Sequence, residues 1–212
     1  MATYIVVTII AYLLGSIIFS VIISKKMAGF DVREKGSGNA GTTNVLRTVG
    51  KKASILTLLG DVLKGVVALL VAYIAGLIVK EGVDKALLVQ LACLSVILGH
   101  TFPIFFGFKG GKGIATALGV LLMTNWNIGL ICLVFALILM ILTRMVSLGS
   151  IAAAILFPVL ITFMPHNAYL VDGNYIIYSI ILAILVVFNH RENVKRLLNG
   201  TENKLDFKKL KK

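Results

Sequence analysis

Two glycine-rich segments carry the residues whose types and spacing are best suited to chemistry. Residues 36–44 read GSGNAGTTN and are followed by Arg47, and residues 108–113 read FKGGKG, with Lys112 near their end. Glycine lets a backbone approach a phosphate closely, and consecutive N–H groups form an anion-binding nest. A guanidinium adds a bidentate fork and an ammonium adds a point charge. The two segments therefore predict two phosphate-binding loops.

Neither segment matches a nucleotide-binding motif in a supporting context. Gly36, Gly38 and Gly41 have the G-x-G-x-x-G spacing, but that fingerprint needs a preceding strand and a βαβ unit, whereas this segment joins two apolar stretches. A Walker A loop would need Gly at position 106 and Ser or Thr at 113, where the chain has Phe106 and Gly113. Dinucleotide and ATP binding are thus unsupported. A plain polar surface loop is the alternative for each segment.

A third polar group lies inside an apolar stretch. Asp61 and Lys64 are three residues apart, so on a helix they share one face and can pair. Charges within a membrane span are costly and usually face a functional interior. Two interpretations are open: a structural ion pair just below the membrane interface, or a direct contact with substrate.

A fourth group begins at Arg144 and resumes near the end of the chain. On a helix, residues spaced i, i+3, i+6 form a slowly drifting polar stripe, which suits the lining of a site. A basic amphipathic segment at the membrane surface is the alternative. The spacing is that of His190, Asn193 and Arg196, and the whole group comprises Arg144, Ser147, Ser150, His190, Asn193, Arg196, Gly200 and Glu202.

The elements that position these groups are membrane spans. The chain has 212 residues, of which 58% are hydrophobic and 14% charged, and its mean hydropathy is +0.98. A soluble domain usually has about 25% charged residues, so a multi-span membrane protein is indicated. The formal charge of +12 fits the cytoplasmic side of a bilayer better than nucleic acid in so apolar a chain. The two cysteines lie in apolar runs and are expected to be core residues, and the N-terminus is expected to enter a first span directly.

The apolar stretches predict seven helices. They cover about 3–24, 53–79, 86–108, 114–124, 128–142, 148–163 and 175–189. The one doubtful junction is 124–127, where a single long helix would give six spans and a tight turn seven. With seven spans, eighteen Lys and Arg residues lie on one side and only Lys80 and Lys85 on the other. The positive-inside rule therefore favours seven, with the N-terminus outside and the C-terminus cytoplasmic.

This topology places every glycine-rich loop on the cytoplasmic face, together with a basic tail at 190–212. The opposite face receives only the short connections 80–85, 125–127 and 164–174. We expect one transmembrane domain over residues 1–212, in the all-α class.

The motifs together resemble one family, the bacterial acyl-phosphate:glycerol-3-phosphate acyltransferases (the PlsY family). The resemblance rests on GSGNAGTTNVLR (36–47), GDVLKG (60–65), GHTFPIFFGFKGGKGIAT (99–116), RMVSLGS (144–150) and HRENVKRLLNGTE (190–202), which occur in family order over nearly the whole chain. It implies seven transmembrane helices and transfer of a fatty acyl group from acyl phosphate to the sn-1 hydroxyl of glycerol 3-phosphate. The products would be lysophosphatidic acid and phosphate, at a first step of phospholipid synthesis.

By the same resemblance the enzyme needs no metal, nucleotide, acyl-CoA or other cofactor. It is expected to be a monomer in the bacterial cell membrane, with its substrates and the lipid bilayer as partners and no nucleic acid. The resemblance gives catalytic roles to Ser37, Arg47, Lys112, His190 and Asn193. Substrate-binding roles go to Gly38, Asn39, Gly41, Thr43, Asn44, Lys64, Gly110, Gly111, Gly113, Ser147, Ser150 and Arg196. Which of Ser147 and Ser150 is the functional serine is open.

For the proton of the attacking hydroxyl there are two candidates, His190 and a phosphate oxygen of the substrate. We favour the substrate-assisted route, because the sequence indicates no carboxylate–histidine pair that would prime a base. A transporter of a phosphorylated metabolite is the alternative function, although transporters usually show internal repeats, and none is evident. A phosphotransferase on lipid alcohols would need an acidic metal-binding cluster, which nine scattered Asp and Glu residues do not indicate.

Overall fold

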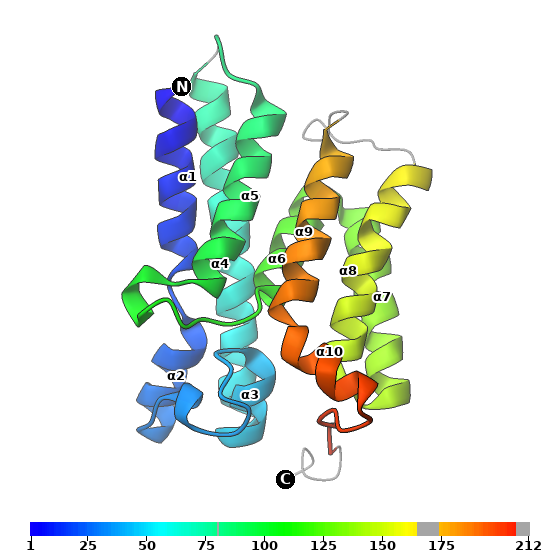
Figure 1. Cartoon of the computed structure of the whole chain (residues 1–212). Coiled ribbons are helices and arrows are strands. Elements are labelled where there is room, and N and C mark those ends of the chain that lie inside the picture. The colour runs from blue at the N-terminus through cyan, green and yellow to red at the C-terminus, as the bar shows by residue number, and fades with distance from the viewer. Residues whose placement is uncertain (80, 165–173, 207–212) are drawn as a thin grey trace. The chain divides into compact units, whose positions relative to one another are not determined.

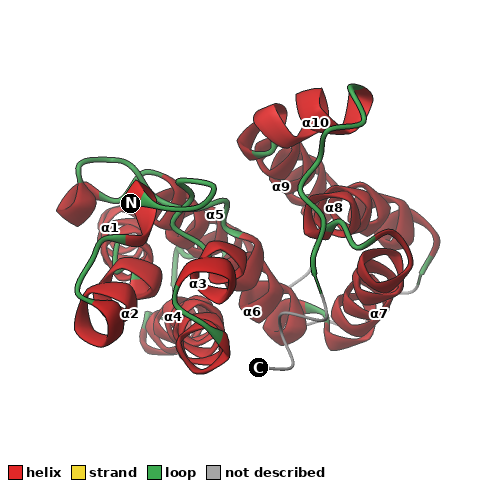
Figure 2. Ribbon diagram, turned by 90° about the horizontal axis from the view of Figure 1, so that it is seen from below, coloured by secondary structure: helices red, strands yellow, loops and turns green. Residues whose placement is uncertain are grey.

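A computed structural model describes residues 1–79, 81–164 and 174–206. Within these ranges the chain is helical and contains no strand, which confirms the predicted all-α class (Figures 1 and 2). The chain divides into two compact units, Met1–Met123 and Thr124–Lys212. That all 212 residues act as a single domain stays a prediction. Lys80, most of the 164–174 connection and residues 207–212 of the basic tail lie outside the described residues.

The first unit is built on three long helices that pack on one another: α1, α4 and α5. Helices α2 and α3 pack against α4 as well. The elements, in order, are α1 (Ala2–Gly15), α2 (Phe19–Ala28), η1 (Val32–Glu34), α3 (Thr42–Thr48), α4 (Lys51–Ile78), α5 (Lys85–Thr101), η2 (Ile104–Phe106) and α6 (Ile114–Thr124), whose last turn crosses the boundary between the units.

Glycines let these helices approach closely. A Cβ at Gly15 of α1 would overlap the carbonyl oxygen of Val96 of α5, and one at Gly119 of α6 would overlap that of Val62 of α4. Helix association in lipid depends on such close packing, because apolar side chains gain little by leaving lipid for protein. A larger residue at either position would therefore separate two helices.

The first apolar stretch is broken in the middle, which the sequence did not reveal. Helix α1 ends at Gly15 and α2 begins at Phe19, so residues 16–18 interrupt what we predicted as one helix over 3–24. Part of the break is satisfied locally, because the Ser16 amide donates to the Tyr12 carbonyl at 2.9 Å. A buried side chain from α4 completes it, as described below.

In its described residues, 124–164 and 174–206, the second unit contains the helices α7 (Trp126–Thr143), α8 (Val146–Phe163), α9 (Tyr175–Asn189) and α10 (Arg191–Leu198). Helix α8 packs against both α7 and α9. An aromatic cluster joins α8 to α9: the Phe157 ring meets the Tyr175 ring edge-on at 5.9 Å between centroids, and Tyr175 stacks on Tyr178 at 5.2 Å. The Tyr175 hydroxyl donates to Thr124 Oγ1 at 2.9 Å, which satisfies its polar group within the apolar cluster.

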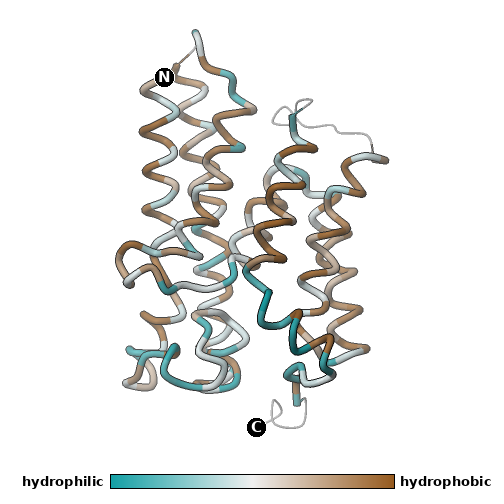
Figure 3. Tube along the Cα trace, in the orientation of Figure 1, coloured by the Kyte–Doolittle hydropathy of each residue, from teal (hydrophilic) through white to brown (hydrophobic). Residues whose placement is uncertain are grey.

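Each of the seven apolar stretches contains an α-helix, and apolar residues dominate those helices in Figure 3. The predicted bounds were wrong in two of them: residues 16–18 break the first, and the stretch predicted over 86–108 ends as α5 at Thr101 and is followed by the short η2. In the part of the chain that the structure describes, five segments are long and apolar enough to cross a membrane, and the α9–α10 pair, bent by 65°, would make a sixth. Helix α6 has only 11 residues, about 16 Å at 1.5 Å per residue, which is short of a ~30 Å hydrocarbon core. An integral membrane protein is confirmed, and the seven-span count and its orientation stay predictions.

The predicted break at 124–127 is confirmed as a break between helices. Helix α6 ends at Thr124 and α7 begins at Trp126. The Asn125 side chain caps α7, because its Oδ1 accepts a hydrogen bond from the Ile128 amide at 3.3 Å. An asparagine at this position therefore starts the new helix by satisfying one of its unpaired N–H groups.

Candidate active site

The first glycine-rich loop, residues 36–41, is organised around the buried side chain of Asn44. Its Oδ1 accepts from the Ser37 amide at 2.9 Å. Its Nδ2 lies within hydrogen-bond distance of three carbonyl oxygens, those of Val32 at 2.9 Å and of Lys35 and Asn39 at 3.0 Å. Asn44 is 1% exposed. One amide thus holds both sides of the loop.

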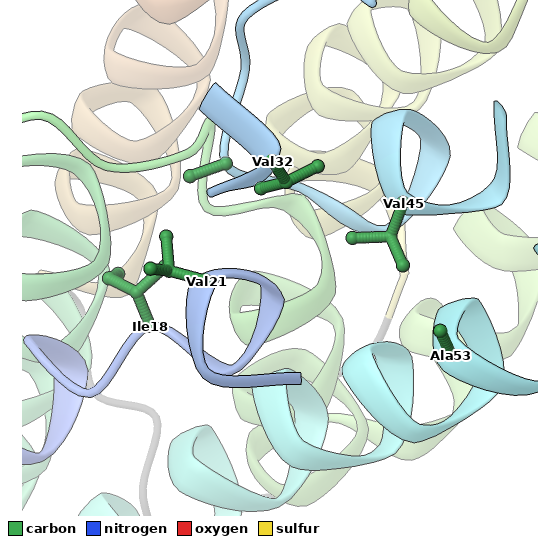
Figure 4. Packing of buried hydrophobic residues seen from close by; sticks show 6 residues of the cluster. Ile18, Val21, Val32, Val45 and Ala53 are labelled. Carbon is green, nitrogen blue, oxygen red and sulfur yellow. The ribbon is translucent and has the colours of Figure 1, made fainter. Parts of the chain in front are cut away.

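A small apolar core supports the same loop from below. Ile18, which immediately precedes α2, and Val21 of α2 lie opposite Val32 and Val45, with Ala53 of α4 completing the cluster (Figure 4). Ala40, from the loop itself, is also part of this core and is fully buried. The loop is therefore anchored at both ends rather than being a free surface segment.

Arg33 joins the first loop region to the second. Its guanidinium forms a bidentate pair with Asp31, at 3.0 Å from Nε and 2.8 Å from Nη2. Its Nη1 donates to the carbonyls of Phe106 at 2.8 Å and Lys109 at 3.0 Å. The hydrogen bond from Arg33 lowers the pKa of the Asp31 carboxyl, against the opposing effect of burial. No motif marked Arg33 as important, because its partners lie more than 70 residues away in sequence.

The second glycine-rich loop folds back onto the end of α5. The Gly110 amide donates to the Thr101 carbonyl at 3.2 Å and the Gly111 amide to the His100 carbonyl at 3.1 Å. A Cβ at Gly111 would overlap the Nε2 edge of the His100 ring and would lie 2.5 Å from the Ala40 carbonyl oxygen. Since Ala40 belongs to the first loop, Gly111 is where the two loops meet. The structure thus brings the two predicted loops together within the first unit.

Hydrogen bonds within the protein occupy several of the backbone amides that the sequence predicted would bind an anion. Besides Gly110 and Gly111, three amides of the first loop are engaged internally: Ser37 with Asn44, Gly38 with Lys35, and Gly41 with Asn39. A donor already used in this way cannot also point at an anion. The glycines serve the fold instead: Gly36, Gly38 and Gly113 adopt φ angles of +64°, +71° and +79°, which other residues rarely take. Phosphate binding by these loops would fall mainly to side chains.

The side chains predicted to bind phosphate in the first unit lie at its surface. Ser37 and Arg47 are exposed, and Lys112 is half-buried. Arg47 lies in the last turn of α3, and Lys112 immediately precedes Gly113 and the start of α6. Thr43 is half-buried beside Asn44 at the start of α3, and Asn39 is half-buried in the loop. These groups are accessible as the prediction requires.

Asp61 and Lys64 form the predicted ion pair, at 2.9 Å, with side chains no more than 3% exposed. The Lys64 ammonium also donates to the carbonyls of Gly15 at 3.0 Å and Ile17 at 2.7 Å, at the break between α1 and α2. His100 Nδ1 lies 2.8 Å from the same ammonium and 3.4 Å from Asp61 Oδ1. This geometry supports the structural interpretation of the two that the sequence left open. It also places the Asp61 carboxylate beside a histidine, at 3.4 Å from His100 Nδ1, but that nitrogen accepts from the Lys64 ammonium, so the carboxylate does not prime His100 as a base.

In the second unit, Glu202 gathers three of the predicted side chains. Its Oε1 accepts from Ser147 Oγ at 2.9 Å and from Asn193 Nδ2 at 2.8 Å, and its Oε2 pairs with Arg196 Nε at 3.0 Å. Burial raises the pKa of the Glu202 carboxyl, but the hydrogen bonds from Asn193, Ser147 and Arg196 outweigh it, so the pKa lies below its ordinary value. The sequence placed Glu202 in this polar group, but we had assigned it no catalytic or binding role.

His190 lies at the bend between α9 and α10 and is 3% exposed. Its Nδ1 is 2.8 Å from the Val186 carbonyl oxygen, which can only accept, so Nδ1 carries the proton. In the neutral ring Nε2 is then the acceptor. Of the two candidate serines, Ser147 donates to Glu202, whereas Ser150 donates to the Val146 carbonyl of its own helix at 3.0 Å. The choice between them stays open.

Comparison with known proteins gives consistent matches over nearly the full length. Residues 5–200 match the model of the family described as glycerol-3-phosphate acyltransferase. The chain is 46% identical to a glycerol-3-phosphate acyltransferase of Clostridioides difficile over 98% of each chain. It is 42% identical to one of Neisseria meningitidis, over 94% of this chain and 96% of the other.

Two solved structures match as well. A crystal structure of PlsY, described as an integral membrane glycerol 3-phosphate acyltransferase in its glycerol 3-phosphate form, aligns with a TM-score of 0.84 and 38% identity, over 98% of each chain. The lysophosphatidic acid form aligns with a TM-score of 0.81 and 37% identity, over 96% of this chain and 95% of that one.

Proposed function

The chain belongs to the glycerol-3-phosphate acyltransferase family, and we propose that it moves a fatty acyl group from acyl phosphate to the sn-1 hydroxyl of glycerol 3-phosphate. It is an integral membrane acyltransferase that makes lysophosphatidic acid, as the two matching structures with glycerol 3-phosphate and lysophosphatidic acid indicate. The observation that carries this function is the match to the glycerol 3-phosphate form over 98% of both chains. Family membership favours the acyltransferase over the transporter.

We propose acyl phosphate as the donor because the family resemblance implies it and because the first unit carries accessible cationic side chains that can bind phosphate. With this donor both substrates carry a phosphate, and the accessible groups of the first unit include Arg47 and Lys112. An acyl phosphate is a mixed anhydride with a good leaving group. The enzyme therefore has mainly to position two phosphates, neutralise them and stabilise a tetrahedral oxyanion. No group on the protein has to be acylated first.

The roles of individual residues follow from the family resemblance and the local geometry. Arg47, Lys112 and Arg196 neutralise phosphate, and Ser37 orients the reacting groups. Asn44 has its amide taken up by the loop backbone, so it acts on Ser37 through the loop. Asn193 and Arg196 are oriented by Glu202.

For the proton we favour a phosphate oxygen of the substrate as the acceptor. His100 lies beside the Asp61 carboxylate, but it is 3% exposed and its Nδ1 already contacts the Lys64 ammonium. His190 Nδ1 is held by a backbone carbonyl, which primes a base less strongly than a carboxylate. A His190→Ala enzyme that keeps an ionisation near about pH 6, typical of a phosphate monoester, supports this route, and loss of that ionisation counts against it.

We further propose seven spans, with the N-terminus outside and the glycine-rich loops on the cytoplasmic face of the bacterial cell membrane. Helix α6 then crosses a locally thinned membrane or extends through its flanking residues. Single-cysteine variants near Lys25 and Lys85, labelled by an impermeant reagent in intact cells, test the orientation. Labelling near Lys25 but not near Lys85 would reverse it.

The function is tested with purified protein, labelled glycerol 3-phosphate, and either palmitoyl phosphate or palmitoyl-CoA, with a chelator present. We expect labelled lysophosphatidic acid from palmitoyl phosphate alone. Product from palmitoyl-CoA alone would overturn the proposed donor, and no product from either would overturn the proposed function. Ser37→Ala should lose most activity, whereas Lys26→Met, an exposed lysine on α2, should retain it.

A further inference from the structure

The second glycine-rich loop rests on the end of α5, where His100 contacts both Gly110 and Gly111. The backbone carbonyl of His100 accepts from the Gly111 amide at 3.1 Å, and its ring edge lies against the same glycine. A Cβ at Gly110 would also overlap the His100 carbonyl oxygen. The placement of the loop, and of Lys112 directly after Gly111, therefore depends on where His100 is held.

His100 is held in turn by Lys64. An ammonium can only donate, so the 2.8 Å contact makes His100 Nδ1 an acceptor and leaves the proton of the neutral ring on Nε2, the edge that faces Gly111. Asp61 Oδ1, 3.4 Å from the same nitrogen and 2.9 Å from the ammonium, balances the charge. Thr116 of α6, which follows the second loop in the sequence, places its hydroxyl 3.5 Å from the same Nδ1.

The three hydrogens of the ammonium are all accounted for. One goes to His100, and the other two go to the carbonyls of Gly15 and Ile17, which the break between α1 and α2 leaves without helical partners. No donor remains for a substrate phosphate. Lys64 thus ties the broken first span to the residue on which the second loop is seated.

We propose that Lys64, with Asp61 and His100, is a positioning cluster for the proposed reaction. The cluster fixes the second glycine-rich loop against Ala40 of the first, so that Lys112 is correctly placed for phosphate. The inference rests on the proposed function for its kinetic test, but the loop geometry that it describes can be measured without turnover.

The direct test is hydrogen exchange of the Gly110 and Gly111 amides in Lys64→Met. Loss of the support beneath His100 should speed their exchange about tenfold, the equivalent of about one net hydrogen bond. The control is Leu69→Ala, which truncates a buried side chain of the same helix, five residues beyond Lys64. Unchanged exchange in Lys64→Met, or equal acceleration in Leu69→Ala, would overturn the inference.

A kinetic test distinguishes a role of Lys64 in positioning the second loop from a role only in stabilising the fold. Lys64→Met leaves Asp61 buried without its partner and should lower stability, whereas the neutral pair Asp61→Asn/Lys64→Met should recover it. We expect the KM for at least one phosphate-bearing substrate to stay about tenfold raised in the neutral pair, because methionine cannot donate to His100. Recovery of KM together with stability would mean that the ion pair only stabilises the fold, and would refute the proposal.

If the variants at the buried residues Lys64 and Asp61 fold poorly, a substitution in the second loop itself tests the same contact. Gly111→Ala places a methyl group against the His100 ring and the Ala40 carbonyl, so it disturbs the same contact. It should raise the same KM, and its effect should not add to that of Lys64→Met. Full additivity would show that the two changes act independently. Wild-type protein that makes no product would count against the proposed function, while the exchange experiment would still decide the positioning role.

Discussion

Replacing Asn44 by alanine should release the first glycine-rich loop. The side chain of Asn44 accepts one hydrogen bond, from the Ser37 amide, and its two hydrogens are shared among three carbonyls. Three bridging hydrogens at about 1 kcal/mol each amount to about 3 kcal/mol, or on the order of a 100-fold increase in the open form of the loop.

Trypsin offers the assay, because Lys35 immediately precedes the loop and cleavage after it requires local opening. We expect the Asn44→Ala protein in detergent to be cleaved there on the order of 100 times faster, provided that opening and closing outpace cleavage. Asn44→Asp should be no better, since a carboxylate would face the three carbonyl oxygens that now receive N–H donors. Thr57→Ala, whose hydroxyl bonds to the Ala53 carbonyl within α4, is the control. Cleavage at the wild-type rate in Asn44→Ala would show that the amide does not hold the loop.

Three further outcomes follow from the same structure. The pKa of the Glu202 carboxyl is lower in the folded protein than in the unfolded chain. The ionised carboxylate therefore contributes its full stability above the unfolded-state pKa, and this contribution is lost as the pH falls through the folded-state pKa. The melting temperature, measured against pH, should show this loss in the wild type and not in Glu202→Gln. In Arg33→Lys the new side chain cannot bridge Asp31 and two carbonyls at once. The KM for glycerol 3-phosphate should therefore rise several-fold, roughly the effect of one lost hydrogen bond. An unchanged KM would show that the Arg33 contacts do not position the second loop. Gly15→Leu should push α1 away from α5, costing about 1–3 kcal/mol or more, and a melting temperature equal to that of the wild type would contradict the close packing at Val96.

The sequence alone was sufficient for the class of the protein and for the approximate positions of its long apolar helices. Long apolar stretches must be helical in a bilayer, because every backbone polar group needs a partner within its own segment. The turn at 124–127 could be predicted as well, since Asn125 has the short side chain that caps a following helix. The glycine-rich motifs could be located for the same kind of reason, because they depend on residue type and short spacing.

The partners of those motifs depend on the tertiary structure, because they come from distant parts of the chain. Arg33 meets Phe106, Glu202 meets Ser147, and Lys64 meets His100 only after the helices pack. No local pattern records such contacts. The break in the first span escaped prediction for the same reason: its free carbonyls are satisfied by Lys64, which is 47 residues or more away in sequence.

What the backbone amides of the glycine-rich loops bind is decided by the tertiary structure and not by the sequence. Their spacing indicated loops whose amides could surround an anion. In the folded chain several of those amides are used to seat one loop on His100 and to wrap the other around Asn44. A backbone amide has a single hydrogen, and whether it binds a ligand or the protein itself is decided by which acceptor the tertiary structure brings near it.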